Sequence, residues 1–210
     1  MTEYWTEAQA LAGELSELRK AFHRRPELGN REWETAARIE AFLRSCGIET
    51  ERLLDTAVIG RLRGAGDGPC VALRADMDAL PIQEATGADF ASEVPEVMHA
   101  CGHDVHLAAV LGAAKLLSSH RDRLAGSVVF LFQPDEEGDG GARRLIDAGV
   151  LTGVDYSFSR NFYVGMAVEP FRYSYGVVEY RPQEGLANLG ADTHFLGAFA
   201  APRLKIGFLF

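Results

Sequence analysis

A nine-residue stretch, MHACGHDVH (98–106), concentrates side chains that bind metal ions or carry protons. His99, Cys101 and His103 follow one another at two-residue intervals, so in an extended chain they point to the same side. A thiolate and imidazoles suit zinc or a similar first-row divalent ion. The stretch is therefore predicted to supply half of a metal site. His106, in the first turn of the helix predicted next, is expected to cap or pack instead.

Acidic residues follow two apolar runs that are predicted to be buried strands. They are Asp76 and Asp78 in CVALRADMD, and Asp135, Glu136 and Glu137 in SVVFLFQPDEEG. If the two strands are parallel, both acidic clusters lie at the same edge of the sheet, where α/β proteins bind ligands. So many carboxylates repel one another unless cations neutralise them. The pattern therefore predicts the other half of the metal site, with room for a second ion.

The adjacent pair Glu136 and Glu137 suggests two different roles. One carboxylate can bind the metal while the other holds a water molecule and takes its proton. Other chemistries are poorly supported, because GDGGA is not followed by Lys-Ser/Thr and no G-x-S-x-G motif is present. A structural metal site usually has four Cys/His ligands and no adjacent carboxylate pair, so it ranks last among the alternatives.

The elements that must position these residues alternate between helices and strands. A helix is predicted from about residue 7 to 22, a second from an Asn30 cap to Cys46, and two more in HLAAVLGAAKLLSS and GARRLIDAG. The second is predicted to bury Trp33, Ala37, Phe42 and Cys46. Strands are predicted in AVIGRLRG, CVALRADMD and SVVFLFQ. This alternation predicts an α/β fold with a mostly parallel sheet flanked by helices.

Composition narrows the class of protein. The chain has 210 residues and a net charge of −9 without a Lys/Arg-rich run, which argues against nucleic acid as a partner. It has no apolar run that would span a bilayer, and its N-terminus lacks the features of a secretory signal. Three cysteines indicate reduced thiols in the cytoplasm, with Cys46 and Cys70 as buried packing residues. After about Leu151 only YGVVEYR is predicted as a strand, and the chain is expected to be cut short or degenerate there.

Four motifs occur in the order typical of one family: FHRRPELGNRE, LRADMDALPI, MHACGHDVH and FLFQPDEEGDGGARRLIDAGVL. With them the chain resembles the M20 metallopeptidase and amidohydrolase family, in the branch of hippurate hydrolase and N-acyl-amino-acid amidohydrolases. The resemblance implies hydrolysis of an amide bond in a small N-acyl amino acid or peptide-like substrate. It also implies two divalent ions, such as zinc, manganese or cobalt. The fold implied is a catalytic α/β domain with a smaller lid domain that mediates dimerisation, hence a homo-oligomer.

The resemblance also assigns roles to residues. Cys101, His103 and Glu137 are implied to be metal ligands, Glu136 the general base, and Asp78 the residue that orients the site, with Asp76 as a further partner. The division implied is a catalytic part at 1–185 and the start of a lid at 186–210.

The chain departs from the family pattern in places. Asn161, in FSRNFYV, stands where the family has a histidine ligand, and a further histidine from the C-terminal return is not found. His194, in GADTHFLG, is the candidate for a substrate-contacting lid histidine. Two hypotheses therefore lead: a metal-dependent amidohydrolase, or a non-catalytic remnant that binds metal or a partner chain.

Overall fold

The structure is a computed structural model that describes residues 3–138, 140–150, 154–159, 162–167 and 203–207. Two compact units divide the chain, Met1–Ala148 and Gly149–Phe210, and each is considered by itself. In the first, the helices are α1 (Glu3–Ala10), α2 (Ala12–Arg24), α3 (Trp33–Ser45), α4 (His103–Ser119), the short 3₁₀ helix η1 (Arg121–Arg123) and α5 (Gly141–Asp147). The strands are β1 (Glu49–Leu53), β2 (Ala57–Arg63), β3 (Gly66–Asp76) and β4 (Ala125–Gln133).

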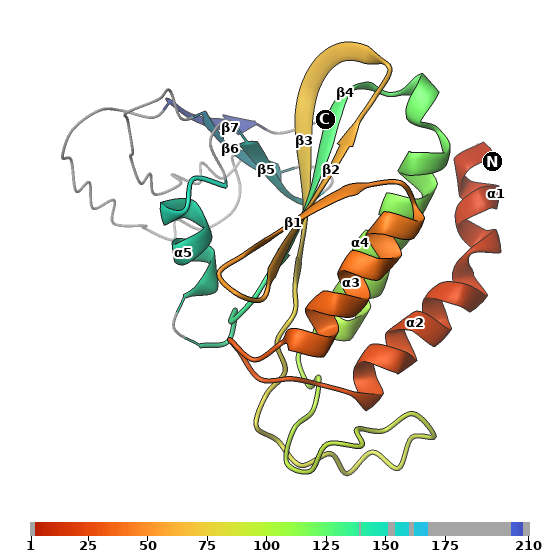
Figure 1. The fold of residues 1–210 in the computed structure, drawn as a ribbon, viewed down its shortest axis with the longest axis vertical. Helices are drawn as coiled ribbons and strands as arrows, with labels where there is room; N and C mark the ends of the chain where they lie inside the picture. The colour runs from red at the N-terminus through yellow and green to blue at the C-terminus, as the bar shows by residue number, and fades with distance from the viewer. Residues whose placement is uncertain (1–2, 139, 151–153, 160–161, 168–202, 208–210) are drawn as a thin grey trace, which may run out of the picture. The chain divides into compact units, whose positions relative to one another are not determined.

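The sheet of the first unit has the strand order β1-β2-β4-β3 (Figure 1). β3 and β4 are parallel, because α4 makes the crossover between them, whereas β1–β2 and β2–β4 are antiparallel. The α/β class with flanking helices is confirmed, but the prediction of a mostly parallel sheet is wrong. For β1 and β2 the physical reason is the short connection at residues 54–56, which can only join antiparallel neighbours.

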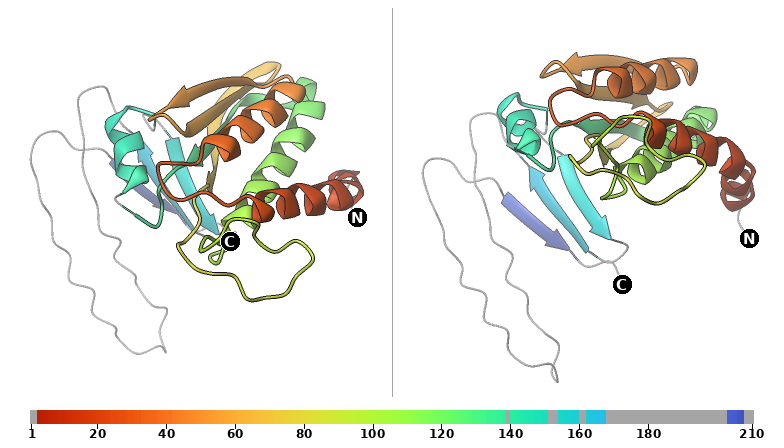
Figure 2. Two further views of the ribbon diagram at one scale, coloured as in Figure 1. Left: turned by 60° about the horizontal axis from the view of Figure 1, so that its bottom comes forward. Right: turned by 90° about the horizontal axis from the view of Figure 1, so that it is seen from below.

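One face of this sheet packs against helices. Figures 1 and 2 show α2, α3 and α4 on the same side of it, and contacts join α3 to β2 and α4 to β3. The residues that the two central strands contribute to this core alternate along the chain, as expected for side chains on one face of a sheet. These residues are Val58 and Leu62 on β2, and Val128, Phe130 and Phe132 on β4. They contact a helical layer that buries Ile39, Leu43, Leu107, Leu111 and Ala114. The packing fixes α4 firmly against β3 and β4.

Of the four predicted helices, two need correction and two are confirmed, among them GARRLIDAG as α5. The first helix is divided at Leu11 into α1 and α2. In α3, Glu32 and not Asn30 precedes the helix, and Trp33 is 51% exposed because the buried positions are Thr35, Ala36, Ile39 and Leu43. The predicted face is therefore wrong at Trp33 and Ala37, which are exposed, whereas Phe42 and Cys46 pack against the core as predicted. In α4, the predicted core positions do contact the core.

Two further differences concern the sheet. β1, with the sequence ETERL, was not predicted, since an exposed edge strand has no apolar run to reveal it. Cys70 is exposed and not buried, whereas Cys46 is half-buried; both thiols are free. The prediction that CVALRADMD is a buried strand is wrong for its first part, since β3 lies at the edge of the sheet and is buried only at Ala75 and Asp76. No helix among the described residues is both long enough and apolar enough to cross a membrane.

The second unit contains the antiparallel strands β5 (Val154–Ser159), β6 (Phe162–Ala167) and β7 (Arg203–Gly207), in that order. The predicted strand YGVVEYR and the predicted division at residues 185/186 lie outside the described residues. The division into a catalytic part and a lid therefore stays a prediction.

Candidate metal centre

The ends of β3 and β4 bring the two acidic clusters together. Asp76 pairs with Gln133 in the parallel register, so the residues that follow each strand leave the sheet at the same edge. The backbone N–H of Glu137 donates a hydrogen bond to Asp78 Oδ2 at 2.9 Å. The predicted meeting of the acidic clusters is confirmed for this pair of strands.

His103 lies between the clusters. The preceding stretch is not extended as predicted, because it turns at Ala100 and Cys101 and Gly102 adopts a left-handed φ of 83° before α4 begins. The ring Nδ1 lies 2.8 Å from the backbone oxygen of Asp78, to which it donates. Such a bond fixes the ring and leaves Nε2 as the metal-binding atom.

Carboxylates surround His103 Nε2 at distances beyond a hydrogen bond. The nearest oxygens of Asp76, Glu136 and Glu137 lie at 3.7, 3.9 and 3.7 Å. Two ligands that each lie about 2.0–2.2 Å from a shared zinc ion are at most about 4.4 Å apart. The separations therefore fit groups that share an ion between them.

Cys101 joins this group through Glu137. Cys101 is exposed. A hydrogen bond from its thiol to the Glu137 carboxylate raises the pKa of Cys101 to about 11. Partial desolvation and the nearby negative charges of Glu136 and Asp78 add to this effect. Without a cation the thiol stays protonated at neutral pH. A bound metal would have to displace that proton, as metals do at thiol ligands.

The charges around His103 act in opposite directions. Burial disfavours the charged ring, but the hydrogen bond to Asp78 and the charge of Asp76 outweigh burial and raise the pKa of His103 to about 9. Burial tends to raise the pKa of Asp78, but the bonds from His103 and from the backbone of Glu137 and Glu136 lower it overall. At neutral pH the metal-free site therefore holds a charged imidazolium among carboxylates.

His99 does not point the same way as Cys101 and His103, which corrects the prediction for this residue. It is 3% exposed, and neither ring nitrogen has a hydrogen-bond partner in the described structure. Burial, with a smaller effect from the charge of His23, outweighs the attraction of Asp104 and lowers the pKa of His99 to about 4. His99 is thus a neutral, buried residue beneath the site.

Asp135 separates from its acidic neighbours. It has a φ of 53°, is buried, and forms an ion pair with Arg144 at 3.0 Å. Its backbone N–H donates to the buried Glu32 at 2.9 Å, and Glu32 also accepts from the Thr56 hydroxyl at 2.8 Å. These bonds hold the turn from which Glu136 and Glu137 project.

His106 is a residue that the sequence argument undervalued. The expectation that it caps or packs is wrong, since its side chain is 54% exposed and its Nδ1 lies 2.6 Å from Asp76 Oδ1. Two groups of potential metal ligands occur in the described chain: His103 with Glu136 and Glu137, and His103 with Asp76 and His106. The spacing of His103 and His106 by three residues, on one helix face, was the available signal.

Comparison with known proteins identifies the family. The model of Peptidase family M20/M25/M40 matches residues 72–202, more than half of the chain. The chain belongs to this family. The M20 resemblance of the four sequence motifs is thereby confirmed. The match includes every residue proposed for the site, from Asp76 to Glu137.

Relatives of the chain within the family are named as different enzymes. Thermostable carboxypeptidase 1 of Saccharolobus solfataricus is 49% identical over 148 residues, covering 69% of this chain and 38% of the relative. N-acetylcysteine deacetylase of Bacillus subtilis is 48% identical over 146 residues, covering 69% and 38%.

A solved structure, the Bacillus subtilis YXEP protein, is described as a dinuclear metal binding peptidase of the M20 family. It is 45% identical with a TM-score of 0.66, covering 70% of this chain and 42% of the other. The chain thus spans well under half the length of these relatives.

Two expectations that concern single residues stay untested, although the chain belongs to the M20 family. Asn161 and His194 lie outside the described residues. The roles implied for Cys101, His103 and Glu137 as ligands, for Glu136 as base and for Asp78 as orienting residue stay predictions. Their donor chemistry fits a divalent ion. Among the described residues, His103 and Glu137 lie close enough together to share one, in a group with Glu136, whereas Cys101 is not part of that group.

Proposed function

We propose that this chain is the metal-binding part of a hydrolase that cleaves the amide bond of N-acyl amino acids or similar small amides. The observation that carries the proposal is the convergence of an imidazole and two glutamates at the edge of β3 and β4, with a thiol hydrogen-bonded to one of the glutamates. The Cys101 thiol forms a hydrogen bond with the Glu137 carboxylate. His103 Nε2 lies 3.7 Å from the nearest oxygen of Glu137 and 3.9 Å from that of Glu136. Two relatives, named a carboxypeptidase and a deacetylase, both act on amide bonds by name.

In this proposal Cys101, His103 and Glu137 hold the ion. A bound zinc, manganese or cobalt ion would supply Lewis-acid activation of a water molecule, lowering its pKa. Asp78 positions the set, because its backbone oxygen fixes His103 and its carboxylate accepts the N–H of Glu137. A complete site would hold two ions, which needs residues beyond those described.

Glu136 is proposed as the general base. Its side chain is 38% exposed, so it reaches both solvent and the edge of the ligand set. It would take a proton from the water and pass it to the amine that leaves when the C–N bond breaks. A general base typically contributes on the order of 10²–10⁴-fold in rate.

The proposal also includes the kind of substrate and the cellular compartment. The substrate is a small molecule and not nucleic acid or a membrane, and the thiols are reduced in the cytoplasm. The free state of Cys46, Cys70 and Cys101 agrees with this setting. A homo-oligomer is part of the proposal, since the family resemblance implies a dimerising lid.

The experiment is an assay of amine release from a panel of N-acyl amino acids by the 210-residue chain loaded with zinc, manganese or cobalt. Glu136→Gln should lower turnover by about 10²–10⁴-fold and leave metal content unchanged. Glu137→Gln should lose both, and the exposed Glu34→Gln serves as the control. Turnover that survives Glu136→Gln would refute the role of the base.

The non-catalytic alternative is kept because the chain spans only 38% of its relatives' length. Metal binding without turnover of any substrate in the panel would favour that alternative over the hydrolase.

A further inference from the structure

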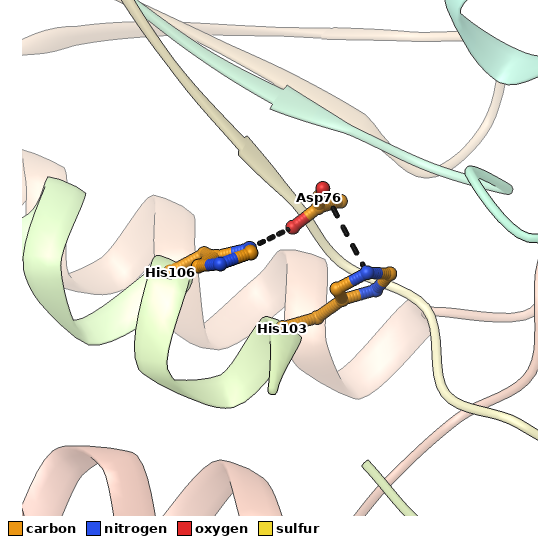
Figure 3. Close-up of side chains that lie close together, drawn as sticks. All are labelled: Asp76, His103 and His106. Atoms are coloured by element: carbon orange, nitrogen blue, oxygen red, sulfur yellow. Dashed lines mark hydrogen bonds and ion pairs between the residues drawn. The ribbon is translucent and has the colours of Figure 1, made fainter. Parts of the chain in front are cut away.

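Asp76, His103 and His106 form a second group of potential metal ligands, which has His103 in common with the group of Glu136 and Glu137. Figure 3 shows the Asp76 carboxylate between the two imidazoles, which project from the same face of α4. Asp76 Oδ1 lies 2.6 Å from His106 Nδ1, and Asp76 Oδ2 lies 3.7 Å from His103 Nε2. One ligand atom from each residue lies within 4.8 Å of the others. The three groups can therefore reach one ion without a change of backbone.

Rigid elements hold the three side chains. Asp76 is the last residue of β3. His103 and His106 lie three positions apart in the first turn of α4, so their rings stack with centroids 5.7 Å apart. Contacts between α4 and β3 fix the strand end against the helix. A site built on a strand and a helix keeps its ligand geometry better than one built on loops.

The donor set has the chemistry of a metal site with an open position. Two imidazoles and one carboxylate form the protein ligands of many zinc and iron enzymes, where water takes the remaining position. His103 Nδ1 bonds the Asp78 backbone, which leaves Nε2 for the ion. The His106 side chain is 54% exposed and Asp76 only 9%, so an ion held there would face solvent on one side.

We propose that Asp76, His103 and His106 form a second ligand set for a divalent ion, which shares His103 Nε2 with the set of Cys101 and Glu137. One lone pair binds one ion, so the two sets are alternative positions for an ion at His103. All three ligands lie within residues 76–106, so the second set needs nothing from residue 151 onward. The inference uses the His103 of the proposed function but does not depend on hydrolysis.

The two sets differ in a way that spectroscopy detects. The first contains the Cys101 sulfur, and the second contains only nitrogen and oxygen. Cobalt(II) bound through a thiolate shows sulfur-to-metal charge-transfer absorption in the near ultraviolet, and zinc absorption fine structure shows a sulfur neighbour at about 2.3 Å. Each set also has one exposed ligand of its own, Cys101 or His106, whose replacement leaves the core untouched.

The test is a titration of the metal-free 210-residue chain with cobalt(II) and zinc(II), in the wild type, Cys101→Ser, His106→Gln and the double variant. The matched control is His120→Gln, which removes a histidine just beyond the other end of α4 that bonds Glu7. Folding of each variant is checked by circular dichroism. Activity is not part of the readout, so failure here is distinct from failure of the proposed hydrolase.

Cys101→Ser should still bind one ion, without a sulfur signal, and adding His106→Gln should weaken that binding at least about 10–100-fold, the loss typical even of outer-shell changes. His120→Gln should bind like the wild type. Two results would overturn the inference: Cys101→Ser that binds no ion, or a double variant that binds as tightly as Cys101→Ser.

Discussion

The charge of Asp78 should control the protonation of His103, and replacing that charge tests the electrostatic account of the site. In the metal-free protein the pKa of His103 is raised to about 9, against burial, by the hydrogen bond to Asp78 and the charge of Asp76. Asp78→Asn keeps the backbone oxygen that accepts from Nδ1 and the size of the side chain. It removes the charge and one of the two carboxylate oxygens, so the pKa of His103 should fall.

The size of the fall follows from the geometry. Asp78 Oδ1 lies 3.5 Å from His103 Nδ1. Two unit charges at that separation interact with about 1.2 kcal/mol in bulk water and about 4.7 kcal/mol at an effective dielectric constant of 20. Since 1.36 kcal/mol corresponds to one pKa unit, the pKa of His103 should fall by about 1 to 3. Asp76→Asn, whose carboxylate lies 3.7 Å from Nε2, should lower it by a similar amount.

The assay is a titration of the histidine ring resonances by NMR in metal-free protein with a chelator present. Glu96→Gln, an exposed carboxylate on the loop that precedes the site, is the control and should leave the pKa of His103 unchanged. An unchanged pKa in Asp78→Asn would refute the argument, because the nearest carboxylate would then contribute nothing to the charge of the ring.

Three more predictions follow from the site and its support. Glu136→Gln should bind zinc like the wild type in a metal titration, because it removes a proton acceptor and no ligand; loss of the ion would contradict its assignment as base. The pKa of His99 is lowered to about 4 by burial, so its contribution to stability is present above about pH 6.5 and is lost as the pH falls toward 4. In the wild type, His99 should contribute at most about 3 kcal/mol to the rise in the free energy of unfolding between pH 4.5 and 6.5. His99→Gln should therefore flatten this rise, and equal slopes in the wild type and the variant would contradict the prediction. Glu32→Ala leaves the Thr56 hydroxyl and the Asp135 N–H without their acceptor and should cost about 2–6 kcal/mol in urea unfolding; a cost near that of the exposed Glu34→Ala would refute it.

The apolar pattern predicted the parts of the fold that depend on burial. β2, β4 and α4 were predicted because each places a run or stripe of apolar side chains in the core. β3 was also found from its apolar run, although it is buried only at its end, Ala75 and Asp76. β1 was missed because an exposed edge strand gains its stability from pairing with β2, which no local pattern records. The mixed sheet was missed for the same reason, since alternation of helices and strands does not specify which strands pair.

The site was predicted where residue type alone decides the chemistry. Cys101, His103 and the adjacent glutamates stood out because few side chains bind metals. The direction of each side chain was less predictable: the left-handed Gly102 separates His99 from His103, and the positive φ of Asp135 turns it away from Glu136. A sequence shows that a glycine permits such a turn, but the surrounding packing decides whether it is made.

The charge of the His103 ring offsets the negative charge of the carboxylates beside it. Asp76 and Asp78 lie 3.7 and 3.5 Å from the two ring nitrogens, so the ring is placed beside two carboxylates of like charge. The ring, with its pKa raised to about 9, supplies the missing cation by holding a proton on each nitrogen at neutral pH. Ion binding at Nε2 then exchanges one cation for another and leaves the bond from Nδ1 to the Asp78 backbone in place. The two carboxylates beside the ring therefore keep the imidazole ligand charged, and the Asp78 backbone keeps it oriented, until the metal arrives.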